Sequence, residues 1–334
     1  MLSNAKLAKS KPLISELMKK VFLIISLFFI LVSKSNTAQA QYYFFDDDYF
    51  DNPWLYEAGV SLNAMNCLTD MGGNIGLGTT FLKDLNMGKT HMSGGVFFGV
   101  AYKNAVSLRL EGTFGKISGN DNVLRGVTDI AKERFNRNLN FRSYITDINL
   151  MFEVHPKFIF IDWPARDYAP SRTSPYLLGG IGYFSFNPQT KLLTSNAYID
   201  LQPLHTEGQG FPESGIKNYK LNQFSLPLGA GLKYELSPLI NLRAECVYRK
   251  LFTDYIDDLS TRYADPAWFD KYLTPQKAEL AKLLYDRQIE NRTGPGGKRG
   301  TFKNNDAYFT VNLKISVIIG RDRVRGTRLA NCGR

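Results

Sequence analysis

The chain of 334 residues is poor in the side chains that build redox, metal and disulfide sites. It holds three cysteines and three histidines: Cys67, Cys246, Cys332, His91, His155 and His205. An odd, widely scattered set of cysteines indicates neither a disulfide framework nor a zinc site. None of the histidines stands at metal-ligand spacing from another histidine or a cysteine. We therefore expect no metal and no cofactor, and we interpret the cysteines as incidental.

The sequence also lacks an apolar run long enough for a transmembrane helix. The longest run, Val21 to Val32, would reach only about 18 Å as a helix, against a hydrocarbon core of roughly 30 Å. Five lysines precede it, and a polar stretch ending in Ala38-Gln39-Ala40 follows. This order predicts a secretory signal peptide over residues 1–40, cleaved after Ala40, with a single membrane anchor as the alternative. Membrane residence of the mature chain would then require a closed barrel, and the other possibility is a periplasmic protein.

A broad excess of positive charge is absent from the body of the chain. The formal charge of +10 includes six lysines and one glutamate in the first forty residues, so the mature chain carries about +5. Most of that excess lies in the basic tail, residues 320–334, whereas residues 41–54 form an acidic and aromatic periplasmic segment. The body therefore offers no electrostatic surface for nucleic acid. The tail is a candidate contact for acidic lipid or an acidic partner surface.

What the mature chain has in abundance is period-two alternation of apolar and polar residues. Eight segments show this alternation: 55–66, 92–102, 106–117, 141–155, 175–186, 223–235, 241–249 and 308–317. The fifth segment is rich in glycine, and its two faces are ambiguous. Tilted membrane strands need roughly 9 to 11 residues, whereas soluble strands usually have about five or six. The lengths therefore favour strands that cross a membrane.

The polar faces of these segments carry five basic and six acidic side chains. They are Arg109, Lys233, Arg243, Arg249 and Lys314, with Glu57, Glu111, Asp147, Glu153, Glu235 and Glu245. A near-balanced set suits a barrel lumen plugged by ion pairs, whereas the core of a soluble antiparallel sandwich, the alternative fold, would not accept it. We therefore predict an all-β fold, an eight-stranded antiparallel outer-membrane β-barrel over residues 55–319.

Long and short connections alternate along the chain. The tight turns are Lys103 to Ala105 and Ser237 to Leu239, which predicts that both termini lie in the periplasm; the connection 156–174 is an exception.

In the last external loop, Thr274 is placed to cap a helix that runs from Pro275 to Glu290. We expect its apolar face to pack on its own barrel, with a partner-binding helix as the alternative.

The loops hold few candidates for chemistry. His205 with Glu207, or with a loop aspartate, would be the centre of a surface hydrolase. The segment Leu204 to Gly210 that holds both residues is instead interpreted as a loop tightened by glycine, whose polar groups bond to its own backbone. On this interpretation the protein is not an enzyme.

Two further loop patterns resemble ligand sites only superficially. Asp254, Asp257 and Asp258 offer carboxylates for calcium, but their spacing matches no calcium loop, and we expect them to cap turns or to pair with arginines. The glycine-rich segment Gly72 to Gly78 lacks the lysine and the following helix of a phosphate-binding loop. We therefore predict no catalytic, cofactor or metal residues.

Six motifs occur in order along most of the mature chain. They are Tyr56–Ser61 with Asp70–Gly73, Arg137–Arg142, Phe184–Pro188, Leu204–Gly210, Tyr248–Asp258 and Lys303–Asp306. Together they resemble the PorG-like family of outer-membrane barrels, which includes a component of the type IX secretion system. The resemblance implies a barrel that anchors or helps assemble that machinery through periplasmic partners, with no catalytic residues to carry over. The alternatives are a small pore and an outer-membrane enzyme that acts on lipid or peptide.

Overall fold

The computed structural model describes residues 53–71, 87–124, 130–159, 172–192, 197–237, 239–301 and 305–319. All of them belong to one compact unit, residues 47–323. The predicted signal peptide, nearly all of the predicted segment 41–54 and the basic tail 320–334 lie outside the described residues. Among the described helices, none combines the length and apolar character that a membrane crossing demands.

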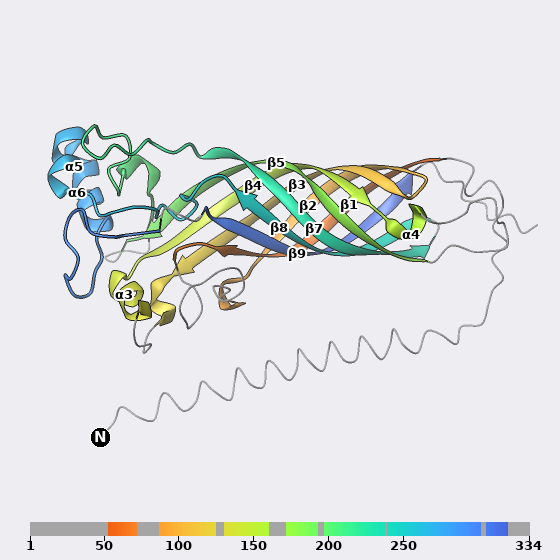
Figure 1. Cartoon of the computed structure of the whole chain (residues 1–334), viewed down its shortest axis with the longest axis horizontal. Coiled ribbons are helices and arrows are strands. Elements are labelled where there is room, and N and C mark those ends of the chain that lie inside the picture. Colours follow the sequence, from red (N-terminus) through yellow and green to blue (C-terminus); the bar gives the residue numbers. More distant parts are fainter. Residues whose placement is uncertain are drawn as a thin grey trace, which may run out of the picture. The chain divides into compact units, whose positions relative to one another are not determined.

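Eight long strands close into an antiparallel barrel (Figure 1). They are β1 (Trp54–Leu68), β2 (His91–Tyr102), β3 (Val106–Asn120), β4 (Asn140–Val154), β5 (Thr173–Lys191), β7 (Asn222–Ser237), β8 (Ile240–Leu251) and β9 (Ala307–Ile319). Each strand pairs with the next, and β9 returns to β1 to close the ring. A short additional strand, β6 (Tyr198–Asp200), pairs with the outer end of β5. The predicted eight-stranded barrel is confirmed.

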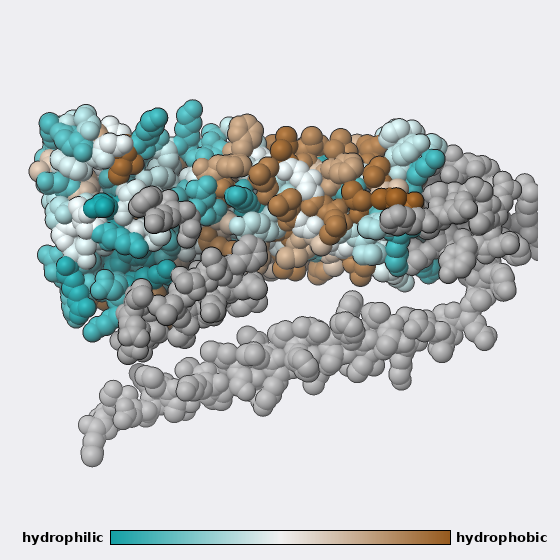
Figure 2. Space-filling view, viewed as in Figure 1, coloured by the Kyte–Doolittle hydropathy of each residue, from teal (hydrophilic) through white to brown (hydrophobic). Residues whose placement is uncertain are grey.

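The two faces of the strands differ as the alternation predicts. Ten of the eleven charged side chains predicted to point inward are buried, and Glu235 is partly buried. The alternate positions are apolar and exposed on the outside of the barrel, as with Val60 at 54% and Leu313 at 63%. Figure 2 shows these apolar residues gathered around the middle of the barrel, with hydrophilic residues over the end that carries the long loops. An outward apolar band on a closed barrel is the pattern of outer-membrane proteins.

The two ends of the barrel differ in the length of their connections. At one end, the tight turn Lys103 to Ala105 joins β2 to β3, and Lys103 and Asn104 adopt positive φ angles of 50° and 56°. The other predicted tight turn joins β7 to β8, although Pro238 within it lies outside the described residues. A short helix, α4 (Pro156–Ile159), also follows β4 at this end. We call this the inner end and the opposite end the outer end, after the usual position of short turns in outer-membrane barrels.

Among the described residues, the long loops at the outer end hold three α-helices, where the sequence predicted one helix. They are α3 (Ile130–Arg137), α5 (Pro266–Tyr272) and α6 (Pro275–Leu284). The α5 helix was missed, although Asp265 accepts a hydrogen bond from the Ala267 N–H as an N-cap and Pro266 follows it.

The predicted helix to Glu290 was too long, although Thr274 occupies the predicted N-cap position and Pro275 begins the helix. The α6 helix ends at Leu284, and beyond it the Ile289 N–H donates to the Asn136 carbonyl of another loop. The side chain of Thr274 makes no capping hydrogen bond. The apolar face of α6, with Ala278 and Leu284, is buried within the same chain, but it packs on loop residues and α5 and not on the barrel wall as expected.

Candidate functional site

A buried ion network occupies the inner part of the barrel lumen. Arg109 on β3 donates to both carboxylate oxygens of Glu245 on β8, at 2.5 and 3.0 Å. The same guanidinium lies 2.6 Å from Glu153 on β4 and 3.2 Å from Glu111. Lys314 on β9 bridges Glu111 and Glu245 at 2.5 and 2.9 Å. All five side chains are buried, so charges on four strands neutralise one another away from water.

Further ion pairs extend this network along the lumen. Arg243 donates to both carboxylate oxygens of Glu57 and lies 2.9 Å from Glu153. The ring of Phe97, buried in the lumen, has three cationic groups near its face: Arg109 at 5.5 Å, Arg243 at 5.9 Å and Lys314 at 5.2 Å from its centroid. Cations close to an aromatic face are attracted by its quadrupole. The lumen is therefore filled by ion pairs and an aromatic ring.

An apolar layer closes the lumen toward the outer end. Its strand residues include Met65, Ile117, Ile145, Phe184 and Phe186, all at or near zero exposure. The sequence left the faces of the fifth segment open, and the structure turns both phenylalanines inward, where their rings stack at a centroid distance of 5.5 Å. Large side chains thus fill the barrel both at the ion network and above it.

The loops above the apolar layer form a compact structure, here called the loop cap and comprising residues 121–124, 130–139, 197–221 and 252–301. Arg137 at the end of α3 binds both carboxylate oxygens of Asp121 at 2.8 Å. The same guanidinium donates to the carbonyl of Arg299 at 2.8 Å and to that of Asp70 at 2.9 Å. Arg137 therefore joins three loops that are far apart in the sequence.

Glu207 is a second residue that links separate loops of the loop cap. Its carboxylate accepts hydrogen bonds from the Ser260 and Thr261 backbone N–H groups at 3.0 and 2.9 Å and from the Thr261 hydroxyl at 2.7 Å. The Arg299 guanidinium also donates a hydrogen bond to this carboxylate, at 3.0 Å. These contacts hold the last loop against the 197–221 loop.

The hydrolase alternative predicted that His205 and Glu207 act together. The carboxylate of Glu207 is committed to Ser260, Thr261 and Arg299, and His205 instead lies beside the Phe211 ring at a centroid distance of 5.4 Å. The backbone of His205 has φ of 49°, and burial lowers the pKa of its ring. The arrangement supports the interpretation of 204–210 as a structural loop.

Asp257 and Asp258, two of the three aspartates after β8, accept hydrogen bonds from backbone and hydroxyl groups. Asp257 accepts from the Met71 and Leu259 N–H groups at 3.2 and 3.1 Å. Asp258 accepts from the Thr206 hydroxyl at 2.5 Å and from the Tyr219 hydroxyl at 2.7 Å. Within the part of the chain that the structure describes, no cluster of His, Cys, Asp or Glu has the arrangement of a metal site. Asp257 takes the expected role in a turn, since its carboxylate accepts from the Leu259 N–H two residues later. Asp258 instead binds two distant hydroxyls, and the arginine close to it is Arg299 and not the expected Arg249 or Arg262.

Burial raises the pKa values of these three carboxyl groups. Burial raises the pKa of Asp254 to about 8, helped by the negative charges of Asp70 and Glu207. Burial also raises the pKa of Asp258 to about 6, although the nearby Arg299 opposes the rise. Burial also raises the pKa of Asp257 well above its ordinary value, and the negative charges of Asp70 and Asp254 raise it further. The loop cap therefore holds protonated carboxyls near neutral pH.

The remaining candidates from the sequence are scattered. Cys67 is buried and Cys246 is exposed on the outer surface, and both are free thiols. His91 bonds to Ser118 at the outer end of the barrel. The loop Gly72 to Gly78 and Cys332 lie outside the described residues.

His155 lies at the inner end, where Ser174 and Glu153 contact it. Its ring lies beside the aromatic ring of Tyr176 at a centroid distance of 4.8 Å. The three histidines therefore occupy separate regions of the described chain.

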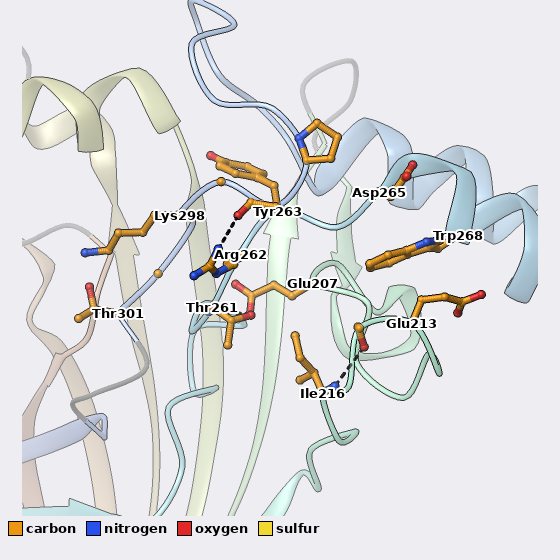
Figure 3. A pocket seen from close by; sticks show the side chains of 15 residues that line it. Glu207, Glu213, Ile216, Thr261, Arg262, Tyr263, Asp265, Trp268, Lys298 and Thr301 are labelled. Carbon is orange, nitrogen blue, oxygen red and sulfur yellow. Dashed lines mark hydrogen bonds between the residues drawn. The ribbon is translucent and has the colours of Figure 1, made fainter.

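An open pocket of about 890 Å³ lies in the loop cap (Figure 3). Its lining comes from the 207–216 loop, the start of α5 and the segments 261–265 and 295–301. The last two segments are held together by an isolated bridge between Arg262 and Lys298 and by the hydrogen bond from Arg262 to the Gly296 carbonyl at 3.1 Å. No sequence pattern predicted this pocket.

Most of the motifs behind the family resemblance meet in the loop cap. Arg137, Glu207, Asp258 and Asp306 come from four different motifs, and each makes at least one hydrogen bond to another segment of the cap or to the adjacent strand ends. The motif signal therefore marks contacts that hold the loops together. For Arg137, Glu207 and Asp306, a charged residue beside glycine or asparagine in a long loop was the available sequence signal, whereas Asp258 has neither neighbour.

Comparisons with known proteins found no matching family model and no matching curated protein. Solved structures with similar chains include the outer membrane protein OprG from Pseudomonas aeruginosa, with 9% identity, a TM-score of 0.34 and coverage of 80% of this chain and 95% of that one. Ail of Yersinia pestis has 8% identity, a TM-score of 0.33 and coverage of 80% and 97%. A major outer membrane protein from Thermus thermophilus has 13% identity, a TM-score of 0.32 and coverage of 79% and 99%. Similarity at this level carries no functional argument, and the barrel itself is defined by its strand pairing.

Proposed function

We propose that this protein is a sealed outer-membrane barrel that serves as an anchor rather than as a channel or an enzyme. The observation that carries this proposal is the filled lumen, in which Arg109, Arg243 and Lys314 are buried among carboxylates. An eight-stranded barrel has an interior just wide enough for side chains to fill, and this one is filled by large charged and aromatic groups. The lipid of the outer membrane is the partner of the apolar outer face.

The proposed anchoring role is in protein secretion. The six ordered motifs resemble the PorG-like family, and on that basis we propose that the barrel anchors or helps assemble type IX secretion machinery through periplasmic proteins. The inner end would provide the attachment. Its short turns present a small surface on which Lys103 and Asn104 hold a fixed backbone conformation.

The two alternative functions make different demands on the molecule. A solute channel requires a continuous water path, which the ion network and the apolar layer oppose. A surface enzyme requires a reactive pair, and among the described loop residues Glu207 is bound to other groups instead of His205. Loss of a measured lipid- or peptide-cleaving activity in His205→Ala or Asp254→Ala would favour the enzyme.

Affinity capture combined with gene deletion tests the secretion role. The full chain with an internal tag in an outer loop would be purified from membranes, and the captured proteins identified. We expect periplasmic components of the secretion machinery among them, and a deletion strain that fails to export its substrates. A deletion strain with normal secretion would contradict the role in secretion. An open pore formed by the purified barrel would instead contradict the proposal that the barrel is a sealed anchor.

A further inference from the structure

The pocket in the loop cap has one wall built around an indole ring. Trp268 on α5 points into the pocket in Figure 3. The Cα of Gly208 faces the indole ring. A Cβ on Gly208 would stand 3.2 Å from the ring, and the φ of Gly208 is +75°, so glycine allows this close support. The indole is therefore partly buried against the loop cap, with part of its surface facing the pocket.

Polar groups of both charges and several hydroxyls surround this ring. Glu213 and Asp265 lie on the side of the indole in Figure 3, whereas Arg262 and Lys298 lie on the opposite side with the hydroxyl of Thr301. One carboxylate oxygen of Glu213 already binds Lys271 at 2.5 Å, and Asp265 caps α5. Each of these groups still has donor or acceptor capacity left for a ligand.

This combination selects among classes of ligand. An anion would meet the carboxylates of Glu213 and Asp265, and a cation would meet Arg262 and Lys298, so neither charge is favoured as a whole. A purely apolar ligand would desolvate four charged groups without compensation. A neutral molecule with many hydroxyls both donates and accepts hydrogen bonds, and its C–H-rich face can pack on an aromatic ring. The volume of the pocket, about 890 Å³, is within the roughly 300–1,000 Å³ usual for small-ligand sites.

We propose that this pocket binds a neutral saccharide, with the sugar ring packed on Trp268 and its hydroxyls bonded to the charged rim. The floor is rigid because Thr261 and Glu207 are bonded to each other and to the cap. The loop end of an outer-membrane barrel faces the cell exterior, where the sugar is either a free glycan or the saccharide of the cell's own surface lipid. This inference is independent of any role in secretion.

Calorimetric titration of the full chain in detergent tests the proposal. The probes are maltohexaose, cellohexaose, chitohexaose and the neutral fraction of the saccharide released by mild acid from the surface lipopolysaccharide, with hexalysine and hexaglutamate as charged peptides. We expect saturable binding of at least one saccharide and none of either peptide. Binding of only the released oligosaccharide identifies the cell's own surface as the source, and binding of the free hexasaccharides identifies an external glycan. Absence of saturable saccharide binding, or tighter binding of a charged peptide, would overturn the proposal.

Matched variants separate a direct contact from loss of the fold. Trp268→Ala should lower the affinity at least about tenfold, which corresponds to about 1.4 kcal/mol. Thr301→Val, which keeps the shape of the side chain and removes the hydroxyl, should lower it roughly threefold. Leu283→Ala changes a residue of α6 that is exposed and outside the pocket, so its affinity should equal that of the parent. Equal affinities in the parent, Trp268→Ala and Thr301→Val proteins would place the saccharide elsewhere.

Discussion

The lumen and the loop cap are both held by buried charged side chains, but these side chains bind different partners. In the lumen, Arg109 binds Glu245 and other carboxylates that project from neighbouring strands. In the loop cap, Arg137 donates to two backbone carbonyls as well as to Asp121, and Asp257 accepts from two backbone N–H groups. Strands satisfy their own backbone through the ladder, so their side chains are free to pair with one another. Loops lack a ladder, and their charged side chains satisfy the backbone instead.

This comparison predicts that the largest loss of stability follows a change in the lumen. Arg109→Met removes the central cation and leaves Glu153 and Glu245 buried with less compensation. We expect the free energy of unfolding to fall by about 3–5 kcal/mol, measured by denaturant titration of the barrel in lipid vesicles. Lys250→Met, on the exposed face of β8, should change it by less than about 0.5 kcal/mol. Equal stability of the two variants would show that the lumen charges do not hold the barrel.

A change in the loop cap should act locally. Arg137→Met unties α3 from the last loop and leaves the buried carboxylate of Asp121 without its guanidinium. We expect faster amide hydrogen exchange in residues 121–139 and 299–301, equivalent to roughly 2–3 kcal/mol, with strand amides unchanged. Lys132→Met, on the exposed side of α3, serves as the control. Slower or unchanged exchange in both segments would show that Arg137 does not link α3 to the last loop.

The loop cap should also weaken as the pH rises. Burial raises the pKa of Asp258 to about 6 and that of Asp254 to about 8, so the folded cap binds protons more tightly than the unfolded chain does. The stabilisation is complete below about pH 4 and is lost as the pH rises through these two values. We expect a loss of roughly 2 kcal/mol in cap stability between pH 5 and 9, because water near the loops reduces the full linkage effect.

Hydrogen exchange of the cap amides, corrected for the intrinsic effect of pH, measures this loss. Asp254→Asn should flatten the dependence, whereas Asp270→Asn, at an exposed site paired with Lys282, should not. A cap that becomes more protected as the pH rises would contradict the sign.

The smallest effect concerns the two neighbouring helices of the last loop. Asp265 caps α5 with its side chain, whereas Thr274 at the same position of α6 makes no such bond. Asp265→Ala should destabilise α5 by about 1 kcal/mol, and Thr274→Ala should have almost no effect on α6. Amide exchange in the first turn of each helix distinguishes the two, and equal effects would show that the cap of α5 is unimportant.

The lumen was predictable from the sequence and the loop cap was not, for a physical reason. Period-two alternation fixes which side of a strand a residue occupies, so the inward position of Arg109 or Glu245 follows from its neighbours. The bond from Arg137 to the Arg299 carbonyl joins residues far apart in loops, where no periodicity sets direction. The apolar layer was missed because Phe184 and Phe186 carry the same apolar character as the lipid-facing residues beside them. The cap of α5 was readable in Asp265-Pro266, but its pocket depends on loop contacts that only the folded chain provides.

The central claim is that the barrel is sealed, and single-channel recording of the full chain in a planar bilayer tests it most directly. The account predicts no steady open-pore conductance for the parent protein across a range of voltages. It also predicts that Arg109→Met shows brief openings, because removing the central cation loosens the packing of the lumen. A stable porin-like conductance of the parent protein would contradict the account.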